Sequence, residues 1–553
     1  MAHAHKSGTV RVEALKVAAK AEDGRETTIV HEVGFEIARG EVLALIGESG
    51  SGKTTIALAM MGYARKGCAI RGGSVDVFGT QVLASSPSEL RALRGNRIAY
   101  IAQSAAASFN PARTIMAQVI ESALIHGSLK AEAATAKAKT LFAELALPNP
   151  DTIGDRYPHQ VSGGQLQRLL AAMALLNDPD LVIFDEPTTA LDVTTQIEVL
   201  VSFKAAIRER GITGIYVSHD LAVVAQIADR IAVLRHGRLA EIGAVDQMVR
   251  APAHPYTRQL IAAASPVKRK GAEAAPETGE APVLAATGIT AGYGPVGADG
   301  LPRVKILHDV GFSLRRGETL GIIGESGSGK STLARVVSGI VPAARGEVRL
   351  DGKALAPALG RRDRETLRRI QIVFQNADTV LNPAQSIAQI LERPLAFYHR
   401  LGASARRQRL MQLLDQVRLP RSVAERRPGE LSGGQKQRIN LARALAAEPD
   451  VILCDEVTSA LDTVVGEAVL DLLVEIQRDL NVAYVFISHD LGVIRSISDA
   501  VMVLQHGRVV EAGPTEALLA APKEPYTRLL LSSVPELRTG WLDEVCAGRG
   551  VAA

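Results

Sequence analysis

The chain has 553 residues, of which 47% are hydrophobic and 22% are charged, and its formal net charge is +4. Because single cores rarely grow beyond about 250 to 300 residues, this length predicts two large folded domains. The small net charge gives no indication of a nucleic-acid partner, and three scattered cysteines fit neither a disulfide framework nor a zinc or iron–sulfur site.

The N-terminal segment MAHAHKSGTVRVEALK (1–16) lacks the apolar core of a signal peptide. Apolar runs elsewhere, such as LLAAMALL (169–176), are far shorter than the ~20 residues that a membrane-spanning helix needs. We therefore expect a soluble chain in a reducing compartment, and any membrane role would depend on partners.

The first motif, VLALIGESGSGKTT (42–55), runs from an apolar strand through a glycine-rich turn into a helix, as a phosphate-binding loop does. Its glycines let backbone N–H groups surround phosphates, Lys53 can reach the β- and γ-phosphate oxygens, and Thr54 can ligate Mg²⁺ at the helix N-terminus. The predicted ATP contacts of this loop are Gly47, Ser49, Gly50, Gly52, Lys53, Thr54 and Thr55.

Two further elements follow before the middle of the chain. The segment AEAATAKAKTLFAELAL (131–147) has helical propensity and no strand signal, so it predicts a helical insertion. The apolar run LVIFD (181–185) predicts a buried strand ending in Asp185, where a carboxylate would contact Mg²⁺ beside the phosphates. Glu186 follows directly and can orient or deprotonate an attacking water.

The rest of the chain repeats these motifs in the same order. GESGSGKS (324–331) repeats the loop, and VILCDEVTSALD (451–462) repeats the strand that ends in an acid. We therefore predict two copies of one domain, at 1–265 and 283–553, joined by a flexible linker at 266–282. Strand-like runs alternate with helical stretches in both copies, which predicts an α/β fold with a parallel sheet. The second copy supplies the ATP contacts Gly324, Ser326, Gly327, Gly329, Lys330, Ser331 and Thr332, the Mg²⁺ ligands Ser331 and Asp455, and the catalytic Glu456.

VSGGQLQR (161–168) and LSGGQKQR (431–438) resemble the signature of ABC-type ATPases, and the resemblance covers almost the whole chain. It implies two P-loop NTPase domains in tandem, each with a RecA-like core, an antiparallel β subdomain and a helical subdomain. In that family two domains enclose two ATP molecules head to tail, and each signature closes on the γ-phosphate held by the other domain. The Lys53 loop is thus paired with the second signature and the Lys330 loop with the first. The signature residues are Ser162, Gly163, Gly164, Gln165, Ser432, Gly433, Gly434 and Gln435.

Three more pairs of residues match family positions that act at the ATP sites. The family's glutamine contacts Mg²⁺ and senses the membrane partner, its histidine contacts the γ-phosphate, and its aspartate links the two sites. The matching pairs are Gln103 and Gln375, His219 and His489, and Asp192 and Asp462, respectively. Two departures, Val161 in the first signature and Val457 after the second glutamate, are apolar and should leave the polar chemistry in place.

The two copies differ where the family places an adenine-stacking ring. Tyr293 matches that position in the second copy, whereas the first copy has no aromatic residue before Phe35 and aligns Ala19 there. Stacking of a base on an aromatic ring is worth ~1–3 kcal/mol in single-stranded nucleic-acid complexes. We therefore expect weaker ATP binding at the Lys53 site unless another side chain replaces the ring.

The ends of both copies, HPYTRQL (254–260) and EPYTRLL (524–530), resemble the tails of the dipeptide, oligopeptide and nickel importer subfamily. ASFNP (107–111) and VLNP (380–383) point to the same subfamily. The resemblance implies ATP and Mg²⁺ as cofactors, two transmembrane permease subunits and an extracytoplasmic substrate-binding protein as partners, and a peripheral location on the cytoplasmic face of the inner membrane. Some relatives carry a cysteine cluster after this tail, but none is present here, so no iron–sulfur cofactor is predicted.

The most specific prediction is an importer motor for short peptides, with nickel chelates, opines or glutathione as alternative cargo. A soluble tandem ABC ATPase acting on ribosomes or nucleic acid is the alternative of a different class. The short, loose linker and the lack of cysteine clusters argue against the ribosome-associated and DNA-repair members, respectively. A regulatory nucleotide-binding protein without turnover is a third possibility, and the intact Glu186 and Glu456 argue against it.

Overall fold

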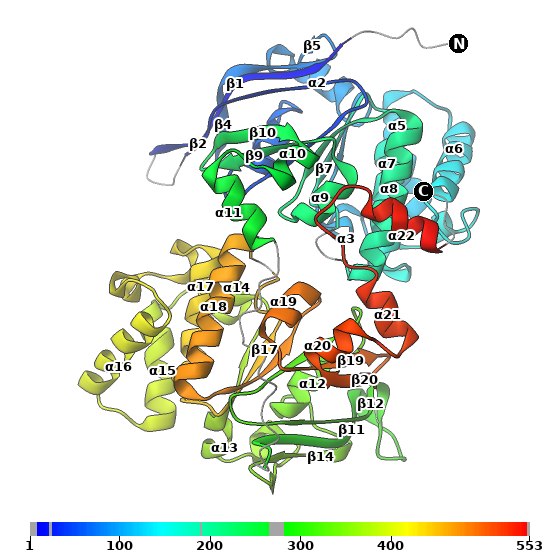
Figure 1. The fold of residues 1–553 in the computed structure, drawn as a ribbon. Helices are drawn as coiled ribbons and strands as arrows, with labels where there is room; N and C mark the ends of the chain where they lie inside the picture. The colour runs from blue at the N-terminus through cyan, green and yellow to red at the C-terminus, as the bar shows by residue number, and fades with distance from the viewer. Residues whose placement is uncertain (1–7, 21–24, 189–190, 265–280, 460, 550–553) are drawn as a thin grey trace. The chain divides into compact units, whose positions relative to one another are not determined.

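The computed structural model describes residues 8–20, 25–188, 191–264, 281–459 and 461–549. Contacts between residues divide the chain into two compact units (Figure 1). The first unit is Met1–Ala264 together with Pro535–Ala553, and the second is Ser265–Val534. The sequence predicted that 535–553 would group with the second copy, because the repeat register gives no sign that the chain returns to the first. Most of the predicted linker 266–282 lies outside the described residues.

The core of the first unit is a six-stranded sheet with the order β10-β9-β3-β8-β7-β6. Its strands pair in parallel except for the antiparallel edge pair β9 and β10. The central strands are almost wholly apolar and buried, as expected when helices cover both faces of a parallel sheet. The strands are β3 (Val42–Ile46), β6 (Ile98–Ile101), β7 (Leu181–Asp185), β8 (Thr213–Val217), β9 (Arg230–Arg235) and β10 (Arg238–Ala244).

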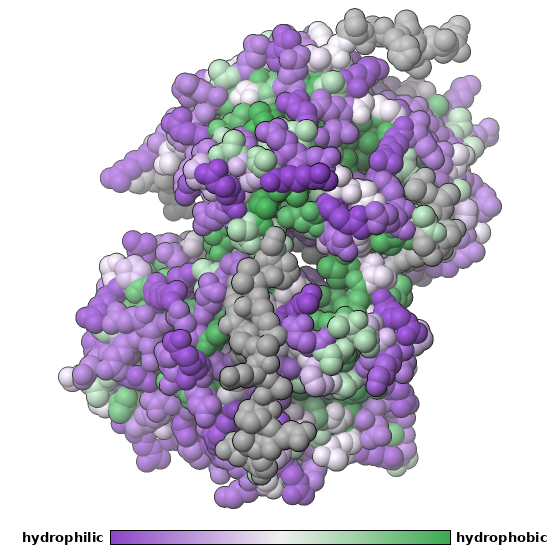
Figure 2. All heavy atoms as spheres, in the orientation of Figure 1, coloured by the Kyte–Doolittle hydropathy of each residue, from purple (hydrophilic) through white to green (hydrophobic). Residues whose placement is uncertain are grey.

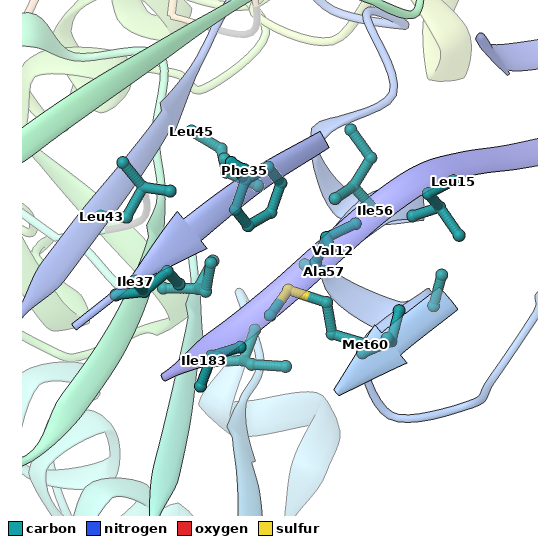
Figure 3. Packing of buried hydrophobic residues seen from close by; sticks show 14 of the residues in the cluster. Val12, Leu15, Phe35, Ile37, Leu43, Leu45, Ile56, Ala57, Met60 and Ile183 are labelled. Carbon is teal, nitrogen blue, oxygen red and sulfur yellow. The ribbon is translucent and has the colours of Figure 1, made fainter. Parts of the chain in front are cut away.

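An antiparallel sheet with the order β2-β1-β4-β5 lies beside this core. Figure 3 shows Val12 and Phe35 of this sheet gathered with Leu43 of β3 and Ile56 of helix α1 (Lys53–Ala59). This shared hydrophobic cluster fixes the start of α1, and with it the phosphate loop, against both sheets. The antiparallel strands are β1 (Val10–Lys20), β2 (Glu26–Ile37), β4 (Cys68–Val77) and β5 (Thr80–Gln81).

Helices between β6 and β7 form the third part of the first unit. The helix predicted within 131–147 is present, and its Ala138, Leu141 and Phe142 are fully buried. It packs against the signature helix, so the insertion supports that helix. The helices here are α3 (Ala105–Ser108), α4 (Ile115–Val119), α5 (Glu121–His126), α6 (Ala131–Glu144) and α7 (Gly163–Leu175).

The second unit repeats this architecture, with sheet orders β16-β17-β18-β13-β19-β20 and β12-β11-β14-β15. The predicted fold, two P-loop NTPase domains each with an antiparallel β and a helical subdomain, is therefore confirmed.

The core strands are β13 (Thr319–Ile323), β16 (Ile370–Val373), β17 (Val451–Asp455), β18 (Ala483–Ile487), β19 (Ala500–Gln505) and β20 (Arg508–Pro514). The antiparallel strands are β11 (Leu284–Val296), β12 (Pro302–Leu314), β14 (Arg345–Leu350) and β15 (Lys353–Ala354). The helices used below are α12 (Lys330–Val337), α17 (Gly433–Leu445), α18 (Thr463–Leu480) and α21 (Pro525–Leu531).

None of the helices within the described ranges combines the length and apolar character that a bilayer span requires. The face seen in Figure 2 is largely hydrophilic, with hydrophobic side chains in separate patches.

Candidate active sites

A glycine-rich loop joins β3 to α1 in the first unit and β13 to α12 in the second. Gly47 and Gly324 have φ values of 153° and 150°. A Cβ atom at either position would lie 2.1 Å from the carbonyl oxygen of Leu234 or Leu504, respectively. Only glycine fits here, so the loop's backbone path depends on these residues.

The lysine of each loop folds back over the loop itself. Lys53 is buried, and its Nζ donates to the carbonyl oxygens of Gly47 (2.7 Å) and Glu48 (2.9 Å). Lys330 makes the same pair of bonds in the second unit, at 2.7 and 2.8 Å. Each loop therefore holds an ammonium group within reach of the place where the phosphate oxygens of a nucleotide would bind.

Next to each lysine, a hydroxyl group contacts a buried aspartate. Thr54 Oγ1 donates to Asp185 Oδ1 (3.0 Å), and Ser331 Oγ donates to Asp455 Oδ1 (2.8 Å). Burial raises the pKa of Asp455, although the Ser331 hydroxyl opposes this shift. A hydroxyl and a carboxylate are oxygen donors of the kind that Mg²⁺ prefers, together with substrate phosphates. The residues present thus fit a Mg²⁺ ion shared with a bound nucleotide.

In each unit the predicted catalytic glutamine and histidine both contact the predicted catalytic glutamate. In the first unit, Gln103 Nε2 donates to Glu186 Oε2 (3.0 Å), and His219 Nδ1 lies 3.2 Å from Glu186 Oε1. In the second unit, Glu456 Oε2 accepts from Gln375 Nε2 at 2.8 Å and lies 3.4 Å from Nδ1 of the corresponding histidine.

The histidine in each cluster stabilises the ionised carboxylate. Burial alone would raise the pKa of Glu456, but the hydrogen bond and charge of His489, with the charge of Lys330, hold it below its ordinary value. Conversely, the hydrogen bond to Glu456 raises the pKa of His489 despite its burial. Burial would lower the pKa of His219, but the hydrogen bond and charge of Glu186, together with the charge of Asp220, raise it above its ordinary value. A carboxylate kept ionised in this way can accept a proton from water.

Both glutamates have an unusual backbone conformation. Glu186 has φ = 49° and Glu456 has φ = 51°, in the left-handed region that residues other than glycine seldom adopt. Non-glycine residues in such sparsely populated regions cluster at functional sites. Nothing in the residue type of a glutamate predicts this conformation.

The signature residues lie at the N-termini of α7 and α17. Ser162 and Gln165 form a reciprocal cap, with Gln165 N donating to Ser162 Oγ (3.3 Å) and Ser162 N to Gln165 Oε1 (3.1 Å). Ser432 and Gln435 repeat these bonds at 3.4 and 3.0 Å. The positive end of each helix is therefore held in a fixed, partly exposed position suited to an anion.

Asp192 and Asp462 also cap helices. Asp192 Oδ1 accepts from Thr195 N (3.0 Å) at the start of α8 (Val193–Arg210), and Asp462 Oδ1 accepts from Val465 N (3.1 Å) at the start of α18. Their predicted role in linking the two sites remains a prediction.

Two kinds of contact at the sites are not predictable from the sequence motifs. Tyr100 donates to Asp185 Oδ2 (2.6 Å), whereas Ile372 takes its place in the second unit. The tyrosines of the two PYT motifs accept a hydrogen bond from the phosphate loops: Glu48 N donates to Tyr256 Oη (3.2 Å), and Glu325 N donates to Tyr526 Oη (2.9 Å). As a sequence motif PYT indicates only the subfamily, because its contact with the loop depends on tertiary packing.

The strand registers support the predicted match between Ala19 and Tyr293. Tyr293 pairs with Val304 in the second unit, and Ala19 pairs with Thr27 at the corresponding place in the first. The Tyr293 ring is 39% exposed, and its hydroxyl lies 3.3 Å from Thr332 Oγ1 on α12.

A small cavity lies at the corresponding place in the first unit. It is lined by Val17, Thr55, Leu58, Tyr63, Ala64, Arg65 and Cys68. Thr55 is the counterpart of Thr332, and the exposed ring of Tyr63 borders the same cavity. Tyr63 therefore places an aromatic ring beside the position of the missing one.

Each unit thus combines a phosphate loop, a paired hydroxyl and aspartate, and a glutamate bonded to a histidine and a glutamine. On this fold, that combination defines a P-loop nucleotide hydrolase with two sets of predicted catalytic residues. The family described as "ABC transporter" matches residues 30–189 and 307–459, and "Oligopeptide/dipeptide transporter, C-terminal region" matches 240–291 and 510–551.

Known proteins resemble almost the whole chain. It is 38% identical over 547 residues to the glutathione import ATP-binding protein GsiA of Salmonella typhimurium strain LT2, covering 93% of this chain and 87% of that protein. It is 39% identical over 550 residues to GsiA of Escherichia coli O157:H7, covering 93% and 88%. A dimeric ATP-binding cassette solved with ADP and Pi is 30% identical, covers 42% of this chain and 98% of that chain, and has a TM-score of 0.37. The chain therefore belongs to the ABC transporter family, as an ATP-binding and ATP-hydrolysing subunit.

Proposed function

We propose that this chain is the motor of a bacterial ABC importer for short peptides. The observation that carries the proposal is the double match to the oligopeptide/dipeptide transporter C-terminal region, following two complete sets of catalytic residues. The relatives named for glutathione import favour glutathione, itself a small peptide, as the second candidate.

In each site the chain's own residues bind ATP and activate water. The loop amides and Lys53 or Lys330 bind the phosphates, and Glu186 or Glu456 accepts the proton of the attacking water. Thr54 with Asp185, and Ser331 with Asp455, would hold Mg²⁺, with Gln103 and Gln375 as further contacts. The ion would neutralise the charge that develops on the phosphates.

The proposed motor works as a sandwich. The signature Ser432, Gly434 and Gln435 would close the Lys53 site, and the first signature would close the Lys330 site. This pairing explains why each signature helix presents a capped, partly exposed N-terminus.

The proposed partners are two transmembrane permease subunits and an extracytoplasmic substrate-binding protein. The motor would lie peripherally on the cytoplasmic face of the inner membrane, and the exposed surfaces at Gln103 and Gln375 would each receive a permease helix. ATP-driven closure would then turn the permease outward to accept cargo.

Uptake by reconstituted vesicles tests the cargo. Vesicles containing the motor, both permease subunits and the binding protein should take up labelled di- to decapeptides only with ATP and Mg²⁺, and unlabelled glutathione, nickel chelates and opines serve as competitors. Uptake of non-peptide cargo alone would overturn the peptide proposal while keeping the importer. Failure to co-purify with any permease, together with co-sedimentation with ribosomes, would favour the soluble ATPase instead.

A further inference from the structure

The C-terminal end of the chain packs on the first half. Residues 535–549 follow the second half in sequence, yet their contacts place them in the first unit. Helix α22 (Trp541–Arg549) lies against α8, as Figure 1 shows in red and teal. We call residues 535–549 the tail.

One buried side chain of the first half forms most of its hydrogen bonds with the tail. Gln226, on α9 (Leu221–Ile227), is 3% exposed. Its Nε2 donates to the carbonyl oxygens of Glu536 (2.8 Å) and Arg538 (2.9 Å) and to that of Ala222 in its own helix (3.1 Å), and its Oε1 accepts from Leu542 N (3.0 Å). A buried amide needs such partners, so the bonds explain why glutamine occupies this position.

Charged and apolar contacts surround this amide. Lys204 Nζ on α8 donates to Asp543 Oδ1 (2.7 Å), and its side chain is only 10% exposed. Thr539 Oγ1 donates to Asp246 Oδ1 (2.8 Å) on α10 (Val245–Arg250). Of the tail's own side chains, Trp541, Leu542 and Cys546 are almost fully buried. Lys204, Gln226 and Asp246 together form what we call the receptor.

The receptor exists in only one half. The positions that correspond to Lys204, Gln226 and Asp246 in the second half hold Val474, Ser496 and Glu516. Ser496 is buried but donates to Val493 O (2.8 Å) within its own helix, so its hydroxyl is satisfied without a tail. The first half is followed by SPVKRKGAEAAPETGEAP (265–282), which contains neither tryptophan nor leucine and therefore offers no matching tail.

We propose that the tail is an intramolecular clamp, which recognises the receptor of the first half and keeps the two halves of one chain together when ATP is absent. The segment 265–282 joins the halves once, and the docked tail joins them a second time. A second connection raises the effective concentration of each half for the other, which favours pairing within one chain over pairing between chains.

Cutting the chain between its halves tests the clamp. A protease site is placed within 266–282 of the full chain, and the folded protein is cut and run on a sizing column with EDTA and without nucleotide. The halves should co-elute. The Gln226→Ala and Lys204→Ala double variant should release at least about tenfold more separated halves, whereas the matched Ser496→Ala and Glu516→Ala variant should behave as the parent. Separation of the parent halves, or co-elution of the receptor variant, would overturn the proposal.

The tail also carries its own reporter, because Trp541 is the only tryptophan of the chain. In the uncut protein its fluorescence should be blue-shifted and poorly quenched by acrylamide. Leu542→Asp, on the tail and outside the first half's own core, should shift the emission to the red and increase quenching while the circular dichroism of the protein is retained. An exposed tryptophan in the parent protein, or an unchanged spectrum in a folded Leu542→Asp variant, would contradict docking.

Discussion

The glutamate–histidine pair shows how two neighbouring charges set the reactivity of one residue. Each glutamate is mostly buried, with side chains 18% and 19% exposed, and burial alone would favour the protonated form. His489 reverses this preference at Glu456 through a direct contact, and His219 makes the same contact with Glu186. Because the same arrangement occurs in both halves, the function of the pair can be tested by changing both copies together.

Replacing both glutamates should separate ATP binding from hydrolysis. Glu186→Gln combined with Glu456→Gln keeps the shape of the side chains and one acceptor oxygen in each, but removes the carboxylate that accepts the proton. We expect ATP to remain bound while turnover falls at least about a hundredfold, the usual scale for losing acid–base assistance. Phosphate release and nucleotide retention are measured on the same sample. Near-normal turnover would remove both residues from the catalytic role.

The histidines should set the acid limit of activity. The pKa of Glu456 is lowered, so its carboxylate stays ionised as the pH falls, until the pH passes through that lowered pKa. In His219→Ala combined with His489→Ala, burial would dominate and the pKa of the glutamate would rise. The acid limb of the pH–turnover profile should therefore move to higher pH, whatever the loss in maximal rate. His159→Ala serves as a control, and an acid limb that does not move would exclude this electrostatic role.

The two adenine positions should bind with different strength. Lys330→Ala leaves the Lys53 site as the stronger phosphate binder, and Lys53→Ala leaves the Lys330 site. We expect the Lys53 site to bind ATP roughly 5- to 150-fold more weakly, as ~1–3 kcal/mol of lost stacking implies. Titration with a fluorescent ATP analogue measures both affinities. Equal affinities that become unequal in Tyr63→Ala would show instead that Tyr63 replaces the missing ring.

At the scale of single residues, the sequence predicted those site residues whose role follows from a local motif. The lysines, hydroxyls, aspartates and glutamates each belong to a motif that places them just after a core strand, and the carboxyl ends of parallel strands meet at one edge of the sheet. Tyr100 and Gln226 were not predicted, because their partners come from distant segments and depend on how the elements pack. The positive φ of Glu186 was also unpredictable from its residue type.

Among the secondary-structure elements, the helices that carry the PYT motifs support the phosphate loops through hydrogen bonds. Helix α11 (Pro255–Ala263) and helix α21 each begin with the proline of the motif, and the tyrosine that follows is buried. Each hydroxyl accepts the amide hydrogen of the glutamate in the loop, so the helix holds one edge of the loop in place. A motif used as a subfamily marker is thus also a structural support of the site.

Removing these hydroxyls should loosen ATP binding. Tyr256→Phe with Tyr526→Phe keeps both rings but leaves two loop N–H groups without their acceptors, a loss of about 1–3 kcal/mol for each fully buried group. We expect the KM for ATP to rise about 3- to 30-fold with a smaller change in kcat, since the phosphate loop binds ATP before the reaction. Tyr484→Phe, which removes a buried hydroxyl bonded to Leu473 O, is the control. An unchanged KM would limit the motif to a packing role.

The order of strands and helices was largely predictable, since the period of the apolar residues and the glycine-rich turns are local signals. The path of the tail could not be predicted from such local signals. The repeat register ends at EPYTRLL (524–530), and a short helix that packs on a distant part of the chain has no counterpart in the first copy from which to infer its place. Tertiary contacts, rather than local propensity, decide where such a segment lies.

Considered as a whole, the molecule is a repeat with unequal halves. The two clusters of glutamate, histidine and glutamine are equivalent, but Tyr100, Tyr293 and Gln226 each occur in one half only. Two identical domains could pair in several ways, whereas distinct halves joined in one chain can assign each surface a fixed partner. The central question at this scale is therefore which signature closes which phosphate loop.

Combining substitutions in the two halves can identify this pairing. In the Glu186→Gln and Glu456→Gln background, Lys53→Ala empties the first site, and an arginine at Ser432 or Ser162 would obstruct one signature. If each signature closes the opposite site, Ser432→Arg should add almost nothing to the loss of ATP retention caused by Lys53→Ala, because both changes disable the same site. Ser162→Arg should add its full effect, because it disables the Lys330 site. Effects on separate sites add, and effects on one shared site do not. In the reverse pattern, Ser162→Arg would add no further loss of ATP retention to that caused by Lys53→Ala. That result would mean that each signature acts within its own half.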